Sequence, residues 1–182
     1  GGVNRHRVDR VQFTQRNCVA GDEWGAKFSV KDRENPYPFD PDKPVHWIRG
    51  RQVGGRSITW GRQVYRWSDL DFEANLKDGI GVDWPIRYKD IAPWYSYVER
   101  FIGVSGNPEG LAQVPDGEFL PPMALNCAEV AVRDAFSKTY GRDRVLTIGR
   151  FAILTRPPNG RAACNYSGPR PRGCISHSYF TT

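Results

Sequence analysis

The sequence lacks long hydrophobic runs, and it has little methionine and cysteine. No apolar run approaches the roughly 18 residues that a membrane-crossing helix requires, so we predict no membrane span in this chain. Its four cysteines are too few in 182 residues for a fold that depends on disulfides. Runs of five Lys or Arg, internal repeats and low-complexity tracts are also absent. These absences leave a globular protein with a hydrophobic core as the expected class.

The start of the chain also lacks features of a complete translated protein. It opens on Gly1 without a signal peptide, and its only methionine is Met123. We therefore expect a processed product or an internal piece of a longer protein. The localisation, periplasmic or cytoplasmic, stays open, because a missing targeting signal means little in an internal piece.

The sequence is rich in aromatic residues, loop formers and positive charge. Aromatic residues make up 13% of the chain, which argues against disorder. Its 19 glycines and 14 prolines indicate long loops. The net charge of +6 permits a nucleic-acid-binding role, although the sequence shows no stripe of arginines on one face.

Hydrophobic periodicity predicts an α+β fold with long ordered loops. Short strands are expected at 26–31 and 45–48, on either side of a loop at 34–44 whose prolines exclude helix. A longer strand is expected at 144–155, followed by a turn at 157–160. Helices are predicted at 68–77, 90–102 and 126–140, each with a start signal and a glycine at its end.

The spacing of apolar residues also predicts which helix faces are buried. In the helix at 90–102, with Pro93 in its first turn, this face comprises Ile91, Trp94, Val98, Phe101 and Ile102. In the helix at 126–140 it comprises Leu125, Val132, Phe136 and Tyr140. We expect Trp94, Tyr95 and Tyr97 in the core. Glu99 is expected to pair with an arginine, and Asp69 and Asp71 to stabilise a helix start rather than act in acid–base chemistry.

A glycine-rich loop at 53–61 is the strongest candidate for a binding function. Gly54 and Gly55 allow backbone to approach a ligand closely. Ser57 and Thr59 offer hydroxyls, and Trp60 offers a flat face. Five arginines surround the loop, at positions 49, 51, 56, 62 and 66, and no acidic residue lies between Lys43 and Ser68. The loop suits an anionic planar ligand such as a dinucleotide, or it is a turn with solvated arginines.

The segment from Arg49 to Gly61 resembles the flavin-contacting loop of the glucose–methanol–choline (GMC) oxidoreductases. The similarity continues through Arg66, Asp71-Phe72, Asp83-Trp84-Pro85-Ile86, Tyr88, Tyr95, Glu99 and Gly103-Val104-Ser105-Gly106. It covers roughly residues 45–182 and is strongest for the bacterial sugar and polyol dehydrogenases.

The resemblance implies an FAD cofactor held by the loop. Its cofactor-binding residues would be Gly54, Gly55, Arg56, Ser57, Thr59, Trp60 and Gly61. Some relatives carry a histidine, bonded covalently to the flavin, where this chain has Thr59, so the FAD is expected to be non-covalent. Arg56 or Arg51 would offset negative charge on the reduced flavin or its phosphates.

Two expected parts of such an enzyme are missing from this sequence. It has no Gly-x-Gly-x-x-Gly motif for the FAD pyrophosphate, and no C-terminal segment with a catalytic histidine. We expect His6, His46 and His177 to be surface or structural histidines and assign no catalytic residue. The chain therefore resembles the central fragment of a two-domain FAD-binding α/β flavoenzyme. Its expected divisions are an irregular segment at 1–44, the flavin-contacting loop with its following helices at 45–106, and part of the FAD and substrate domain at 107–182.

The cysteine-containing tail departs from its relatives. Related sequences carry four spaced cysteines here that are able to hold an iron–sulfur cluster. This chain keeps only Cys164 and Cys174, with Ser167 and Arg170 at the middle positions. We therefore expect no metal site. Cys164 and Cys174 are expected either to form a disulfide or to stay reduced.

The expected parent protein oxidises the CH–OH group of a sugar or other alcohol by hydride transfer to flavin, with an unknown electron acceptor. We expect the isolated chain to be inactive, which leaves a truncated inactive product as one alternative. The other alternative is a small basic nucleic-acid-binding module, supported by the arginines and aromatic residues. We rank it lower and expect no nucleic-acid partner.

Overall fold

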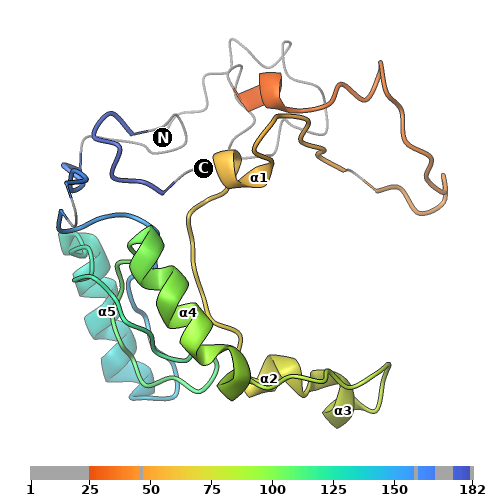
Figure 1. Cartoon of the computed structure of the whole chain (residues 1–182). Coiled ribbons are helices and arrows are strands. Elements are labelled where there is room, and N and C mark those ends of the chain that lie inside the picture. Colours follow the sequence, from red (N-terminus) through yellow and green to blue (C-terminus); the bar gives the residue numbers. More distant parts are fainter. Residues whose placement is uncertain (1–24, 46, 158–159, 167–173, 181–182) are drawn as a thin grey trace. The chain divides into compact units, whose positions relative to one another are not determined.

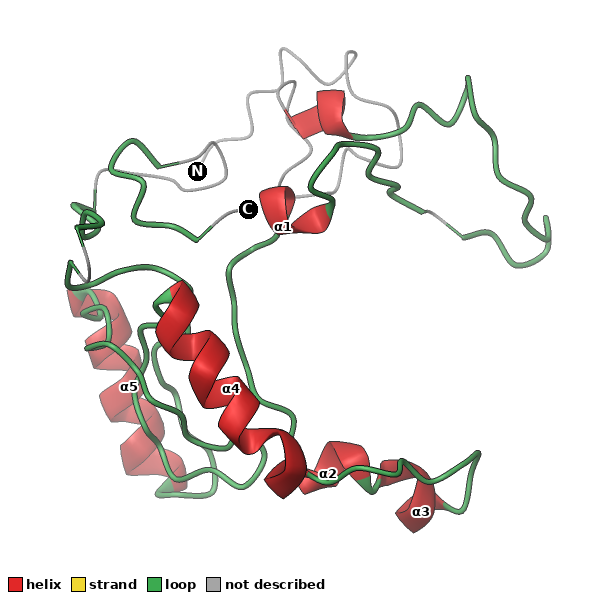
Figure 2. Ribbon diagram, viewed as in Figure 1, coloured by secondary structure: helices red, strands yellow, loops and turns green. Residues whose placement is uncertain are grey.

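The computed structural model describes residues 25–45, 47–157, 160–166 and 174–180 (Figures 1 and 2). The chain divides into two compact units. Unit 1 comprises Gly1–Gly61, Gly168–Gly173 and Thr181–Thr182, and unit 2 comprises Arg62–Ser167 and Cys174–Phe180. No helix within the described ranges has both the length and the apolarity needed to cross a bilayer.

Unit 1 contains little regular structure in its described part. A 3-10 turn, η3 (Gly25–Phe28), is followed by one antiparallel bridge between Ser29 and Gly50. The N–H of Val30 donates to the carbonyl of Arg49 at 2.8 Å beside that bridge. The strands predicted at 26–31 and 45–48 are therefore wrong. The alternating pattern at 26–31 finds a partner at one position only, because its first residues turn into η3.

The loop predicted at 34–44 is confirmed as irregular, and Tyr37 holds its ends together. The Tyr37 hydroxyl donates to the carbonyl of Val45 at 2.8 Å and accepts the N–H of Trp47 at 2.9 Å. The Trp47 ring meets the Tyr37 ring edge to face, and the Arg49 guanidinium lies over the same ring at 4.7 Å. A side chain thus supplies the hydrogen bonds that the proline-rich backbone cannot make with itself.

Unit 2 contains four helices in its described residues: α2 (Asp69–Phe72), α3 (Ala74–Asp78), α4 (Tyr88–Ile102) and α5 (Cys127–Tyr140). The helix predicted at 68–77 is confirmed in position, but it breaks at Glu73 into α2 and α3. The Ser68 side chain accepts the N–H of Leu70 at the start of α2, as expected of an N-cap. Gly79 ends α3 with a left-handed φ of 65°.

The ends of α4 and α5 follow the predicted capping signals. Asn126 and Glu129 form a reciprocal capping box, and Gly141 closes α5. Gly103 closes α4 with a φ of 79°. The start of α4 differs from its prediction: the Asp90 carboxylate accepts the N–H of Arg87 at 2.8 Å, so Asp90 caps a helix that begins two residues before it. Pro93 therefore lies in the second turn rather than the first.

The β component of unit 2 consists of isolated bridges between extended segments, and no longer strand occurs among the described residues. Phe151 bridges antiparallel to both Gln63 and Ser105, and Ile153 bridges to Tyr179. Ser105 also bridges in parallel to Leu120. The strand predicted at 144–155 is thus reduced to a short pairing segment at 151–154. Residues 158 and 159 of the predicted turn lie outside the described residues.

The core of unit 2 forms around this pairing segment. Its buried apolar residues are Phe72, Ile102, Val104, Ala152, Ile153, Leu154 and Tyr179. Gly103 allows α4 to end directly against the core, because a Cβ there would lie 2.2 Å from a methyl carbon of Leu154. The close packing of the end of α4 against Leu154 therefore requires glycine at position 103.

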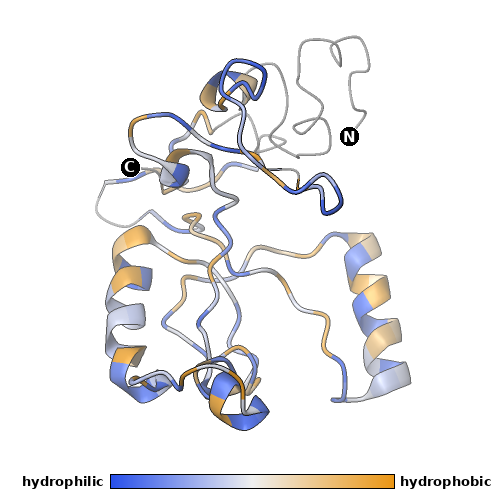
Figure 3. Ribbon diagram, turned by 90° about the vertical axis from the view of Figure 1, so that its right-hand side faces the viewer, coloured by the Kyte–Doolittle hydropathy of each residue, from blue (hydrophilic) through white to orange (hydrophobic). Residues whose placement is uncertain are grey.

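The predicted buried faces of the long helices are largely wrong. Trp94, Tyr97 and Phe101 are 68%, 60% and 66% exposed, and the buried residues of α4 are Glu99 and Ile102. No residue of α5 is buried. In Figure 3, which colours the ribbon by hydropathy, hydrophobic positions recur along both helices. Periodicity located an apolar stripe correctly, but within unit 2 the packed face of α4 is the one that carries Glu99.

A buried ion pair between Arg66 and Glu99 connects α4 with the segment before α2. The Arg66 Nε and Nη2 donate to the two carboxylate oxygens of Glu99 at 2.9 and 2.6 Å. The Nη1 and Nη2 groups also donate to the hydroxyls of Tyr88 and Ser96, at 2.9 Å each. The Glu99 hydrogen bond raises the pKa of the Arg66 guanidinium above its usual value. The predicted pairing of Glu99 with an arginine is confirmed.

Because the pair is buried, removing one partner leaves the other charge buried without a counter-charge. We expect Arg66→Leu to lower the free energy of unfolding by about 3–5 kcal/mol. The exposed pair between Arg100 and Glu118, whose atoms also lie 2.6 Å apart, provides the matched control: Arg100→Leu should cost at most about 1 kcal/mol. Urea denaturation followed by circular dichroism measures both. Equal losses in the two variants would contradict this account.

Candidate functional site

The predicted cofactor loop lies in unit 1 and turns at two glycines. Gly54 and Gly55 have φ values of 87° and 62°, which side chains rarely permit. The Gln52 side-chain amide donates to the carbonyl of Gly55 at 2.7 Å, and the N–H of Gly55 donates to the carbonyl of Gln52 at 3.2 Å. The glycines are therefore required by the backbone conformation of the turn.

A short helix follows this turn, where the sequence predicted only loop. Helix α1 (Arg56–Thr59) begins directly after Gly55. The Ser57 hydroxyl donates to the carbonyl of Gly54 at 2.6 Å, and an Arg56 Nη2 donates to the carbonyl of Ile48 at 2.9 Å. Two side chains predicted to face a ligand thus also fold the loop itself. Sequence reasoning missed this role because it depends on carbonyls that only the folded turn brings near.

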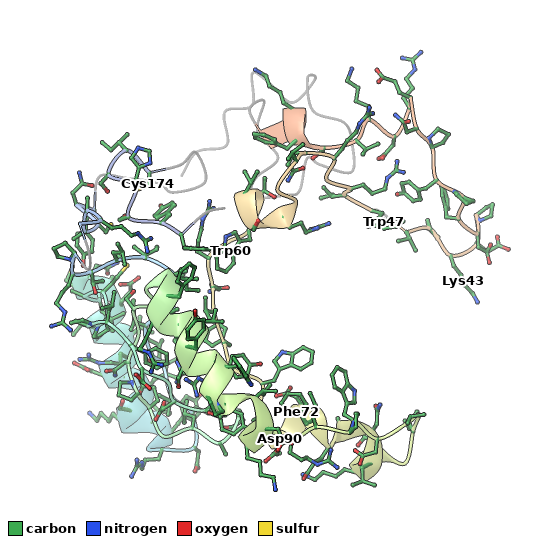
Figure 4. The ribbon with its side chains drawn as sticks, in the orientation of Figure 1. Lys43, Trp47, Trp60, Phe72, Asp90 and Cys174 are labelled. Atoms are coloured by element: carbon green, nitrogen blue, oxygen red, sulfur yellow. The ribbon has the colours of Figure 1, made fainter. Side chains whose placement is uncertain are left out.

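The structure brings all seven predicted cofactor-binding residues into one mostly exposed turn. Gly54, Gly55, Arg56, Thr59 and Gly61 are exposed, while Ser57 and Trp60 are half-buried. Figure 4 shows Trp60 directly after α1. A Cβ at Gly55 or Gly61 would meet no atom within 4 Å. Backbone is therefore accessible at both glycines, as close contact with a flat ligand requires.

The positive charge around the loop is smaller than the sequence predicted. Arg66 is buried against Glu99 in unit 2. Arg49 pairs with Asp32 at 3.0 Å and covers the Tyr37 ring. Arg62 lies over the Tyr179 ring in unit 2. The exposed cations that remain are Arg56, within the loop, and Arg51, just before it. Exposed glycine backbone with two cations fits an anionic cofactor such as FAD in outline.

No catalytic residue is assigned in the described part of the chain. His177 is exposed and has a φ of 51°, and His6 and His46 lie outside the described residues. Ser167 and Arg170 of the cysteine-containing tail also lie outside them. The structure forms no disulfide between Cys164 and Cys174, so of the two expected alternatives it shows the reduced one.

The Cys174 thiol, which the sequence analysis named only as a disulfide candidate, has a distinct chemical environment. Its Sγ lies 3.2 Å from the Ser176 hydroxyl and 3.1 Å from the Ser178 hydroxyl. Partial burial raises its pKa, but hydrogen bonds from these hydroxyls and from backbone outweigh that effect and lower the pKa to about 6. The pattern Cys-x-Ser-x-Ser was the available signal, since a thiolate needs nearby donors.

Comparison with known proteins finds distant relatives of the chain. The chain is 32% identical over 133 residues to the paromamine 6'-oxidase of Streptomyces fradiae, covering 71% of this chain and 22% of that protein. It is 29% identical to the 2-methyl-1,2-propanediol dehydrogenase of Mycolicibacterium austroafricanum, covering 87% and 30%. The fructose dehydrogenase large subunit of Gluconobacter japonicus is 26% identical, covering 92% and 32%. The chain is a distant relative of sugar and polyol oxidoreductases.

This relationship agrees with the resemblance to GMC oxidoreductases seen in the sequence. No protein-family model matches the chain. The chain spans between a fifth and a third of the length of the relatives it matches, since the covered shares run from 22% to 32%.

The lowered pKa of Cys174 predicts its reactivity. Its alkylation rate by iodoacetamide should rise with pH through a midpoint near 6, because the thiolate is the nucleophile. Replacing both Ser176 and Ser178 by alanine should move this midpoint upward, since the thiolate loses two donors. Mass spectrometry of the alkylated peptides, with Cys174→Ser as control, measures the profile. A midpoint near 8.5, the value of an ordinary thiol, would contradict the assignment.

Proposed function

We propose that the protein containing this chain is an FAD-dependent oxidoreductase that oxidises a CH–OH group of a sugar or other alcohol. The alignment with sugar and polyol oxidoreductases over 69–92% of the chain carries this proposal. The exposed glycine turn, which lies in the segment that resembles a flavin-contacting loop, supports it.

The loop residues have distinct parts in this proposal. Backbone at Gly54, Gly55 and Gly61 would lie against the cofactor, because all three are exposed and the space beside Gly55 and Gly61 is open. The Arg56 guanidinium, already anchored on the carbonyl of Ile48, would offset the negative charge of the cofactor. Bound FAD would supply the acceptor for the hydride that leaves the alcohol carbon. The chain's own contribution is therefore binding and orientation, with no acid–base group assigned.

We rank the nucleic-acid alternative lower, and two of its arginines are committed to contacts inside unit 2. It requires arginines that are available on one face, whereas Arg66 and Arg150 are each only 4% exposed. Arg150 donates to the carbonyls of Val114 and Pro115 and pairs with Asp116 at 2.9 Å. These arginines hold loops of unit 2 together rather than offering charge to phosphates.

Glycine 55 provides a direct test of the loop. In the full-length protein, Gly55→Val should reduce the FAD bound per protein severalfold, because a side chain there both strains the turn and fills the space beside it. Gly79→Val is the matched control: Gly79 also has a positive φ of 65° and open space around it, but lies in unit 2. Flavin absorbance after gel filtration measures the content. Equal losses in both variants would attribute the effect to folding alone.

Thr59 predicts how the cofactor is attached. Its side chain offers no atom for the covalent bond that a histidine forms in some relatives, so acid or heat precipitation should release the FAD into the supernatant. The measurement is flavin fluorescence in the supernatant and in the washed pellet. Flavin that stays with the precipitated protein would show that another residue binds it covalently.

A further inference from the structure

The two cysteine-bearing segments of unit 2 are hydrogen-bonded to one buried residue, Leu154. The N–H of Leu154 donates to the carbonyl of Ser178 at 3.0 Å. The N–H of Cys164 donates to the carbonyl of Leu154 at 2.8 Å. Ser178 in turn contacts the Cys174 thiol through its hydroxyl. Leu154 thus brings together segments whose cysteines are ten residues apart in sequence.

Both thiols are half-buried within these segments, and each has local hydrogen-bond partners. The Sγ of Cys164 accepts the N–H of Tyr166 at 3.4 Å. The Sγ of Cys174 lies among the hydroxyls of Ser176 and Ser178 (Figure 4 labels Cys174). The lower pKa that these hydroxyls give Cys174 keeps it largely as thiolate at neutral pH. Cys174 is therefore suited to attack, while Cys164 is available to resolve the product.

A residue with a positive φ angle lies close after each of the two cysteines in the sequence. Among the described residues other than glycine, positive φ occurs at Arg62, Tyr166 and His177. Tyr166 follows Cys164 by two residues, and His177 follows Cys174 by three. The third, Arg62, accepts the N–H of Ala152 through its carbonyl at 2.9 Å, next to the same pairing segment. Such conformations for residues with side chains are strained, and they concentrate at functional and switching sites.

We propose that Cys164 and Cys174 form an exchangeable dithiol–disulfide pair. A small-molecule disulfide, such as oxidised glutathione, is the oxidant. The Cys174 thiolate attacks one of its sulfurs, which breaks that S–S bond, forms a mixed disulfide on Cys174 and releases one thiolate. Cys164 then loses its proton and attacks the Cys174 sulfur, which expels the second thiol. Two protein thiols are oxidised by two electrons, and one small-molecule disulfide is reduced to two thiols.

The pair does not depend on the proposed flavin chemistry, because the reaction requires only the two thiols and the oxidant. It also differs from a permanent structural disulfide, since the structure holds the thiols reduced and solvent reaches both side chains. The state of the pair would report the thiol–disulfide balance of the compartment in which the protein resides.

The test uses the full chain with Cys18 and Cys127 replaced by serine, so that only the pair remains. Incubation with oxidised glutathione at pH 7 should yield a peptide cross-linked between Cys164 and Cys174, and reduced dithiothreitol should reverse it. Cys164→Ser should instead accumulate a glutathione adduct on Cys174. Cys174→Ser should react much more slowly; at pH 6 we expect a loss of about tenfold in the initial rate, because the attacking Cys174 thiolate is gone.

Circular dichroism before oxidation separates chemistry from misfolding, since each single serine variant should keep the spectrum of its parent. Three outcomes would overturn the proposal. One is a stable glutathione adduct on Cys174 even when Cys164 is present. Another is a disulfide only between two copies of the chain, seen as a dimer on non-reducing gels. The third is equal reactivity of the two single variants.

Discussion

The bidentate contact between Arg66 and Glu99 is the constraint on which most of unit 2 depends. It joins residues 33 positions apart, and it draws Tyr88 and Ser96 of α4 into one hydrogen-bonded group. Glu99 also accepts the N–H of Glu118 at 3.3 Å, and a Cβ at Gly117 would lie 2.2 Å from its carboxylate. One carboxylate therefore sets the positions of α4, the segment before α2 and the loop at 117–118. Two buried charges are costly alone, so the arrangement persists only as a complete set.

Local signals in the sequence predicted the helices well. Ser68, Asn126, Gly103 and Gly141 each act within one turn of the residue itself, so their effect is visible without the rest of the fold. Strands and helix faces were predicted poorly because they depend on distant partners. The segment at 144–155 pairs at only two positions, and Trp94 and Phe101 lie exposed where periodicity indicated burial. Periodicity identifies a stripe, but the partner decides whether that stripe is covered.

In the candidate loop, too, the local features were predicted and those that depend on distant partners were not. Gly54 and Gly55 were recognised because a positive φ is a local property of the chain. The pairing of Arg49 was not recognised, and Arg66 was not identified as the arginine that pairs with Glu99, because Asp32 and Glu99 reach these arginines only after folding. Counting arginines near a glycine turn therefore overestimates the charge offered to a ligand. Family resemblance supplied the flavin hypothesis, while the structure supplied the reason that each glycine is needed.

Helix α5 has a consequence for local stability. Its fourteen residues are held by a capping box at one end and Gly141 at the other, and none of its side chains is buried. Short helices without a packed face open easily in water, because little apolar surface is lost when they do. Amide protons of α5 should therefore exchange with solvent well before those around Glu99 and Leu154. A protease that needs an unfolded segment would make its first cut there, and the remainder of unit 2 would keep its own buried contacts.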